Sequence, residues 1–218
     1  MAFGSEDLLR LYERGKDGGP LERARLLGKA ALGDRAEEAP IGDLDRAVWA
    51  LRGTLLDTAA EATTTCPGCG TRLEFEIPRA FGLPERRAVS EVTVTHAGRD
   101  IAVRLPTLRH VTRAGLDLVA LAPEAPWDDP AFRAAAEARI EEADPALAMT
   151  LGFRCEACGA QATPAFDALA FVWGEFEAAA RRVVADVVAL ARGYGWREAD
   201  ILAMSALRRG LYLEALER

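Results

Sequence analysis

All four cysteines of this chain of 218 residues belong to two copies of one motif, C-x-x-C-G. The two intervening residues allow both sulfur atoms of a tight turn to face one ion, and the glycine supplies the positive φ that such a turn requires. Two turns together provide four thiolates, the closed tetrahedral shell of a structural zinc site, with no position open for water or substrate. The motif therefore predicts one structural Zn²⁺ ion and the metal ligands Cys66, Cys69, Cys155 and Cys158.

Three alternatives to a zinc site account for these cysteines less well. A disulfide within a two-residue loop is strained, and the sequence shows no secretory context. A thioredoxin-like dithiol needs one C-x-x-C motif at the start of a helix in a βαβ unit, which leaves the second copy unexplained. Four unrelated buried cysteines would not fall by chance into two identical motifs.

The residues around both motifs have the pattern of β-strands. Threonines at 63–65 precede the first motif, and apolar residues follow it at every second position, from 73 to 77. Short stretches at 148–153 and 160–163 flank the second motif in a similar way. These patterns predict that each motif forms the tip of a β-hairpin. About 85 residues separate the two motifs, whereas an ordinary zinc ribbon has roughly 15–20, so the metal would join segments that are distant in sequence.

The succession of helix and strand signals predicts an α+β fold that is predominantly helical. In this fold, split zinc-ribbon β-hairpins connect an N-terminal and a C-terminal helical part. We expect an N-terminal helical segment at residues 1–57, the split zinc ribbon at 58–166 and a C-terminal helical segment at 167–218. The ribbon would contain an inserted hairpin and helices at about 85–145.

Apolar spacing and capping residues predict the helices in more detail. We expect helices at 6–14, 21–32, 44–55, 108–121, 130–143, for about 25 residues from 167, at 196–204 and after 205. The expected N-terminal caps are Ser5, Asp43, Thr107, Asp128 or Asp129, and Ser205. A second hairpin is expected from strands 88–95 and 100–105. Trp49 is interpreted as a core residue, and Arg208 and Arg209 as exposed residues of the last helix.

The charge and hydropathy of the chain exclude several classes of protein. A net charge of −7 argues against general nucleic-acid binding, which needs a basic face to displace counterions. No basic and apolar leader opens the sequence, and no window approaches 18 consecutive apolar residues, so we expect no membrane span and synthesis in the cytoplasm. The last two helices suggest a helix-turn-helix reader of DNA, but acidic residues within them disfavour phosphate contact.

The sequence shows no recognisable active site, so we expect that the protein is not an enzyme and has no small-molecule substrate. The two histidines, His96 and His110, lie in a predicted turn and on a predicted helix. No nucleophile elbow, phosphate-binding glycine loop or H-E-x-x-H motif is present. The carboxylates are scattered along the faces of predicted helices, where charged residues are normally solvated.

Several features in a fixed order resemble a family of baseplate proteins from contractile phage tails and related injection systems. The family is similar to the small baseplate protein of T-even myophages. The shared features are L-L-R-L-Y-E-R at 8–14, the first cysteine motif through 75, R-L-P-T at 104–107, the second cysteine motif, F-V-W-G-E at 171–175, Y-G-W-R-E-A-D-I-L-A-M at 194–204 and R-R-G-L-Y-L at 208–213. The chain departs from the family at 205–207, where a link that contains proline is expected.

The resemblance implies a structural or assembly component of the baseplate, incorporated into a tail or injection particle, with other baseplate, hub or wedge subunits as partners. It implies no catalytic activity. A nucleic-acid-binding or regulatory zinc-ribbon protein is the alternative, and an enzyme with an unrecognised site is a third interpretation. The aromatic residues Tyr194, Trp196 and Tyr212 could form a docking surface or simply pack the last helix onto the long one; both interpretations stay open.

Overall fold

A computed structural model describes residues 4–56, 59–78 and 80–216. About 53% of the chain is helical and 17% is in strands, all of them in small antiparallel hairpins, which confirms the predominantly helical α+β fold. The boundary that the sequence places at residues 57 and 58 lies outside the described residues. No helix within the described ranges is long and apolar enough to cross a membrane.

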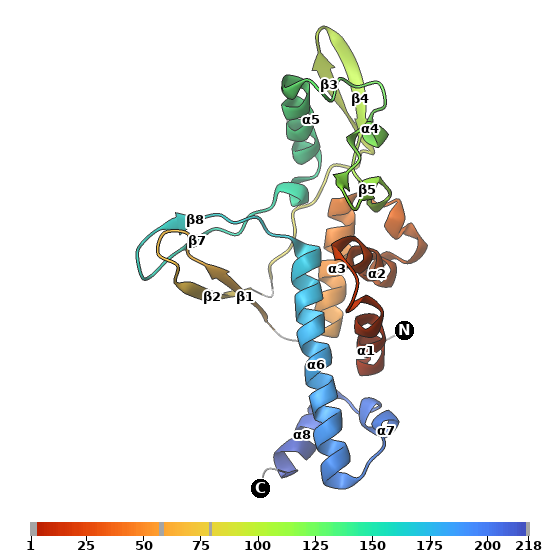
Figure 1. Cartoon of the computed structure of the whole chain (residues 1–218), viewed down its shortest axis with the longest axis vertical. Coiled ribbons are helices and arrows are strands. Elements are labelled where there is room, and N and C mark those ends of the chain that lie inside the picture. The colour runs from red at the N-terminus through yellow and green to blue at the C-terminus, as the bar shows by residue number, and fades with distance from the viewer. Residues whose placement is uncertain (1–3, 57–58, 79, 217–218) are drawn as a thin grey trace.

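The main hydrophobic core lies where three N-terminal helices pack against one long C-terminal helix (Figure 1). The N-terminal helices are α1 (Ser5–Gly15), α2 (Pro20–Leu32) and α3 (Ile41–Leu55), and the 3₁₀ helix η1 (Gly33–Glu37) follows α2. The long helix is α6 (Ala168–Tyr194), as predicted from residue 167 onward. Apolar residues at helical spacing supply this core; its fully buried members include Leu27, Leu44, Val48, Val172 and Ala180.

Two of the predicted caps are wrong. Ser5 is already inside α1, whose N-cap is Gly4, and the carboxylate of Asp7 accepts the Gly4 N–H at 2.9 Å. Asp43 lies in the first turn of α3, which begins after Pro40. Its carboxylate instead accepts from the guanidinium groups of Arg46 and Arg86, at 2.7 and 2.6 Å. The cap of α1 is therefore formed by Asp7 and not by Ser5, and Asp43 forms ion pairs instead of capping α3.

The insert forms a second, smaller core at the upper end of the molecule in Figure 1. Strands β3 (Glu91–His96) and β4 (Arg99–Arg104) form the predicted hairpin, and α5 (Pro130–Ala143) packs against β3. Asp129 caps α5, because its carboxylate accepts the Ala131 N–H at 2.8 Å. Every second residue of the strands points toward α5 and packs against the apolar side of that helix.

The predicted helix at 108–121 is wrong. Thr107 does precede a helical turn, but this is only the 3₁₀ helix η2 (Leu108–His110). The chain then forms a minimal hairpin, β5 (Val111–Thr112) and β6 (Gly115–Leu116), before the single turn α4 (Leu118–Leu121). Gly115 has a φ of 119°, which ends any helix at this point, and Asp117 starts the next turn by accepting the Ala120 N–H. The β-branched residues Val111 and Thr112 and the glycine Gly115 therefore favour a hairpin, although the apolar spacing predicts a helix.

A ribbon arm projects from the side of the helical core (Figure 1). We use this name for two hairpins, β1 (Ala60–Thr65) with β2 (Arg72–Ile77) and β7 (Phe153–Arg154) with β8 (Gln161–Ala162). The rings of Phe75 and Phe153 stack between them, with centroids 6.4 Å apart. The short helix η3 (Pro145–Ala148) connects α5 to the second hairpin. Each hairpin carries one cysteine motif at its tip, as the strand pattern predicts.

The C-terminal end of the chain folds back on α6. Gly195, with a φ of 71°, ends α6 in the left-handed conformation, and α7 (Glu198–Leu202) and α8 (Ala206–Leu216) follow. The predicted cap Ser205 accepts the Arg208 N–H at 3.2 Å. The predicted exposure of Arg209 is wrong: this residue is 2% exposed, because its guanidinium group binds partners from α1, from α6 and from the link between α7 and α8.

Candidate metal centre

The two cysteine turns have the same backbone geometry. In each turn the first cysteine donates its N–H to a carbonyl five residues later and accepts the N–H of the glycine four residues later, at 2.8–2.9 Å. These bonds join Cys66 to Thr71 and Gly70, and Cys155 to Ala160 and Gly159. The two glycines have φ values of 73° and 75°, so the positive φ expected of the motif is confirmed.

All four sulfur atoms lie within 4.8 Å of one another. The Sγ atoms of Cys66 and Cys158 are 3.6 Å apart, and those of Cys69 and Cys155 are 3.7 Å apart. Four thiolates placed about 2.3 Å from a central ion at tetrahedral angles would be separated by about 3.8 Å, whereas a disulfide has a bond of about 2.05 Å. The cluster therefore has the dimensions of a four-sulfur metal site, and both close pairs join one hairpin to the other.

The two turns bury their first cysteine and expose their second. Cys66 and Cys155 lie inside the arm, and Cys69 and Cys158 lie at its surface. With one cysteine of each kind from each hairpin, the ligands would surround an ion from two opposite sides. Such a shell leaves no coordination position for a substrate, so the arrangement suits stabilisation of the fold and not catalysis.

The environment gives the exposed thiols opposite acidities. The Thr71 hydroxyl and backbone N–H lower the pKa of Cys69 to about 6. The Ala160 N–H favours the thiolate of Cys158, but the crowding sulfurs of Cys69 and Cys66 outweigh it and raise the pKa of Cys158 to about 12. Because metals bind thiolates, occupation of the site by a metal would release the proton of Cys158.

Sequence reasoning missed one residue that shapes the cluster, Gly68. A Cβ on Gly68 would lie 3.1 Å from the Cβ of Ala160 and within 4 Å of two of the sulfurs, so glycine lets the first turn approach the second. The C-P-G-C form of the first motif was the available signal for Gly68.

An aromatic cluster fixes the base of the ribbon arm. The indole N–H of Trp49 donates to the Phe81 carbonyl at 3.1 Å, and its ring lies 5.4–5.9 Å from the rings of Phe81, Phe166 and Phe171. These residues come from α3, from the segment after β2, from the segment after β8, and from α6. The prediction that Trp49 packs in the interior is confirmed, and the arm is attached to both helical parts of the chain.

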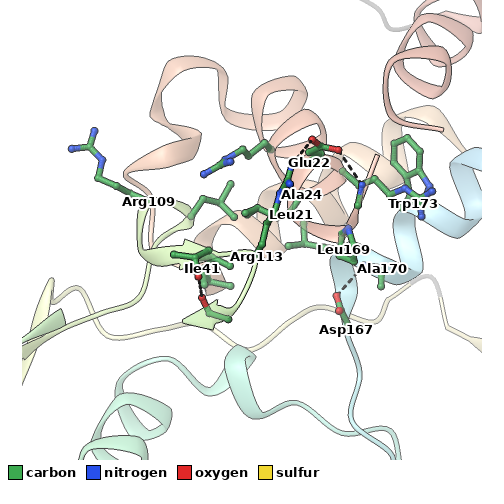
Figure 2. A pocket seen from close by; sticks show the side chains of 18 residues that line it. Leu21, Glu22, Ala24, Ile41, Arg109, Arg113, Asp167, Leu169, Ala170 and Trp173 are labelled. Atoms are coloured by element: carbon green, nitrogen blue, oxygen red, sulfur yellow. Dashed lines mark hydrogen bonds and ion pairs between the residues drawn. The ribbon is translucent and has the colours of Figure 1, made fainter. Parts of the chain in front are cut away.

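A groove of about 910 Å³ lies beside α2, β5 and α6 (Figure 2). Its floor is apolar, with Leu21, Ala24, Ile41 and Leu169. Its acids already have partners: Glu22 accepts the Gly19 N–H at 3.1 Å, and Asp167 accepts the Ala170 N–H at 2.9 Å. The hydroxyl of Thr112, which also lines the groove, donates to the Gly115 carbonyl at 2.9 Å.

Both histidines have structural partners. His110 closes the η2 turn, where its Nδ1 accepts the Thr107 N–H at 3.1 Å. Burial and then the nearby Arg104 and Arg109 lower the pKa of His110, which keeps the ring neutral. His96 Nε2 lies 3.0 Å from a carboxylate oxygen of Asp129, and neither histidine belongs to the metal-binding cluster.

Comparison with known proteins adds no relative to this description. No protein-family model, curated protein or solved structure matches the chain. The four-cysteine cluster is therefore characterised by its own geometry.

Proposed function

We propose that Cys66, Cys69, Cys155 and Cys158 bind one structural Zn²⁺ ion. Four thiolates in a closed tetrahedral shell are the ligand set of structural zinc sites, and the spacing of 3.6–3.7 Å between sulfurs of different hairpins supports one ion between them. The motif repeats, the positive φ of both glycines and the shared hydrogen-bond pattern support the same assignment.

The ion would cross-link two parts of the chain that pair weakly without it. Strands β7 and β8 have two residues each, and an isolated hairpin of this size is unstable in water. The metal would close a loop of about 85 residues, for which constraint of the unfolded chain is large. Zinc would therefore determine whether the ribbon arm is ordered.

We propose further that the protein is a structural or assembly subunit of the baseplate of a contractile phage tail or injection system. The four-cysteine cluster carries this proposal, because it serves a rigid arm and leaves no open coordination site. The motifs that resemble the baseplate family also supply internal contacts: Glu175 pairs with Arg52, and the Trp196 ring stacks on Tyr194 with centroids 4.5 Å apart. Motifs that stabilise the fold through internal contacts are consistent with a structural subunit whose partners are hub or wedge subunits.

The proposal is tested in cells that assemble the particle. An epitope-tagged chain should co-purify with intact particles at a constant ratio to the sheath protein, and deletion of the chain should prevent assembly of complete baseplates. The variant Cys66→Ser/Cys155→Ser should be lost from particles, whereas the exposed strand variant Thr63→Ser should be retained.

Two outcomes would contradict the baseplate proposal. One is a chain absent from purified particles together with normal assembly after its deletion. The other is binding of the purified chain to DNA that persists at physiological salt and weakens as salt rises, the behaviour of a nucleic-acid-binding zinc ribbon.

A further inference from the structure

Exposed apolar side chains are concentrated at one end of the molecule. Among the described residues, six of the nine exposed large hydrophobic side chains follow residue 183; they are Val184, Val188, Tyr194, Leu207, Leu211 and Leu216. They lie on the second half of α6 and on α8, the lower end in Figure 1. A local concentration of this kind marks an interaction surface.

The outer face of α8 carries an apolar stripe that ends in an acid. Leu207, Leu211 and Glu214 follow each other at helical spacing, and the two leucines are 77% and 58% exposed. We call these three residues the α8 stripe. Because they share one side of the helix, a partner can contact all three at once.

Polar contacts of α8 fix the orientation of the helix so that the α8 stripe faces solvent. The buried guanidinium of Arg209, on the opposite side of α8, donates to the Ser5 hydroxyl and the Met204 carbonyl, both at 2.9 Å. It also lies 3.4 Å from a carboxylate oxygen of Asp186 on α6. Rotating the leucines inward would break these bonds and leave a buried charge without partners, at a large free-energy cost.

A second stripe runs along α6. Val184 and Val188 are 49% and 43% exposed, and Arg181 and Arg192 flank them; these four residues form the α6 stripe. Arg181 is paired with Glu177 at 2.6 Å, whereas Arg192 has no ion pair with any described residue. At 100° per residue, the two valines lie on the side of α6 opposite Asp186, which faces α8.

The two stripes are complementary in charge. Each has two aliphatic side chains one turn apart, and one ends in a carboxylate where the other ends in guanidinium groups. Two α6 stripes in antiparallel contact would bring Arg181 of one helix close to Arg192 of the other, which is repulsive. Since the two stripes face opposite ways on one molecule, a single twofold contact cannot use both.

We propose that the α8 stripe of one copy of this chain docks on the α6 stripe of a second copy. Such a head-to-tail contact leaves one free stripe of each kind at its two ends, so it continues into a ring or an open chain. The contact uses neither the cysteine cluster nor the groove. It goes beyond the proposed baseplate function, and neither requires the other.

The test measures the molar mass of the full chain by light scattering and sedimentation. Protein concentrations extend up to about 200 µM, so that association with a micromolar dissociation constant is detected. The wild-type mass should rise above that of two chains as the concentration increases. The α8 variant Leu207→Gln/Leu211→Gln and the α6 variant Val184→Gln/Val188→Gln should each remain a single chain. All four side chains are exposed, so circular dichroism and the thermal midpoint should not change; the control is Val119→Gln, another exposed valine, which should associate as the wild type does.

Mixing the two variants distinguishes a head-to-tail contact from any other. The α8 variant keeps an intact α6 stripe and the α6 variant keeps an intact α8 stripe, so an equimolar mixture should form a pair of two chains and nothing larger. As a variant that leaves the apolar contacts in place, Glu214→Arg should weaken wild-type association at low salt by about tenfold. Three outcomes would each overturn the proposal: a wild-type chain that stays monomeric, an α8 or α6 stripe variant that associates as the wild type does, or a mixture of the two stripe variants that stays monomeric.

Discussion

Arg52 of α3 and Glu175 of α6 form a two-point ion pair across 123 residues of sequence, with nitrogen–oxygen distances of 2.8 and 2.7 Å. The side chain of Arg52 is 7% exposed and that of Glu175 is 17% exposed, and the Arg52 guanidinium group lies over the ring of Trp49 at the base of the ribbon arm. The parallel bonds orient α3 on α6 as well as neutralising both charges. This ion pair therefore joins the N-terminal and C-terminal helical parts beside their shared apolar core.

Replacing one member of this pair should destabilise the protein strongly. We expect Glu175→Gln to lower the free energy of unfolding by about 3 kcal/mol, because it removes the carboxylate charge that pairs with the buried Arg52 guanidinium group. Urea unfolding followed by circular dichroism measures the change. The exposed pair of Arg10 and Glu6 is the control, since Glu6→Gln should cost less than about 0.5 kcal/mol; equal effects at the two sites would contradict the importance of burial.

A matched pair of glycine substitutions should act in opposite directions. A Cβ at Gly15 would overlap the indole of Trp173, whereas a Cβ at Gly53, inside α3, meets nothing within 4 Å. Gly15→Ala should therefore destabilise the protein by about 1–3 kcal/mol through overpacking, and Gly53→Ala should stabilise it by about 0.5–1 kcal/mol. Thermal unfolding of both variants checks the signs. Stabilisation by Gly15→Ala would contradict the close packing of α1 against α6.

Asp45 should make stability depend on pH. Burial first, and then the charges of Asp167 and Asp144, raise the pKa of Asp45 to about 7 from its ordinary 3.8. The folded state thus holds this proton more tightly than the unfolded chain does. The contribution is complete below about pH 4 and is lost as the pH rises to about 7, at a cost of roughly 2–4 kcal/mol.

The variant Asp45→Asn should remove that loss, because the amide is neutral at every pH. We expect Asp45→Asn to be more stable than the wild type at pH 8 and to differ little from it at pH 4. Urea unfolding of both proteins from pH 4 to pH 8 isolates the contribution as a difference. A constant difference across this range would contradict the titration of Asp45.

Removal of the metal should unfold the ribbon arm and spare the helical core. The two-residue strands β7 and β8 cannot persist alone, whereas α6 is held by the packing of α1, α2 and α3. Hydrogen exchange with and without a chelator should show loss of protection at the amides of Cys66 and Cys155, with α6 unchanged. Retained protection at both cysteines would contradict a metal-dependent arm.

The features of the fold that could be predicted from the sequence are those specified by residues close to one another in the chain. The cysteine turns, the β3–β4 hairpin, the Asp129 cap of α5 and the extent of α6 all follow from local signals that agree with one another. The approach of the four sulfurs was also predictable, since the repeated motif implies a shared ion. The turns, the hairpin and the cap depend on chemistry within about ten residues of each position, whereas the approach of the sulfurs depends on the identity of two distant motifs.

The failures concern side chains whose partners are remote in sequence. Asp43 satisfies Arg86 instead of capping a helix, and Arg209 binds Ser5, more than 200 residues away. Nothing near these residues specifies such partners, because ion pairs and buried hydrogen bonds are properties of the packed molecule. The inverted polarity of α8, with arginine inside and leucines outside, could not be inferred from its spacing alone.

Zinc K-edge X-ray absorption on protein purified without added metal tests the central claim most directly. We predict about one zinc per chain, with four sulfur ligands at about 2.3 Å and no oxygen or nitrogen in the coordination shell. Less than half an equivalent of zinc in stably folded protein, or a shell with fewer than four sulfurs, would contradict it.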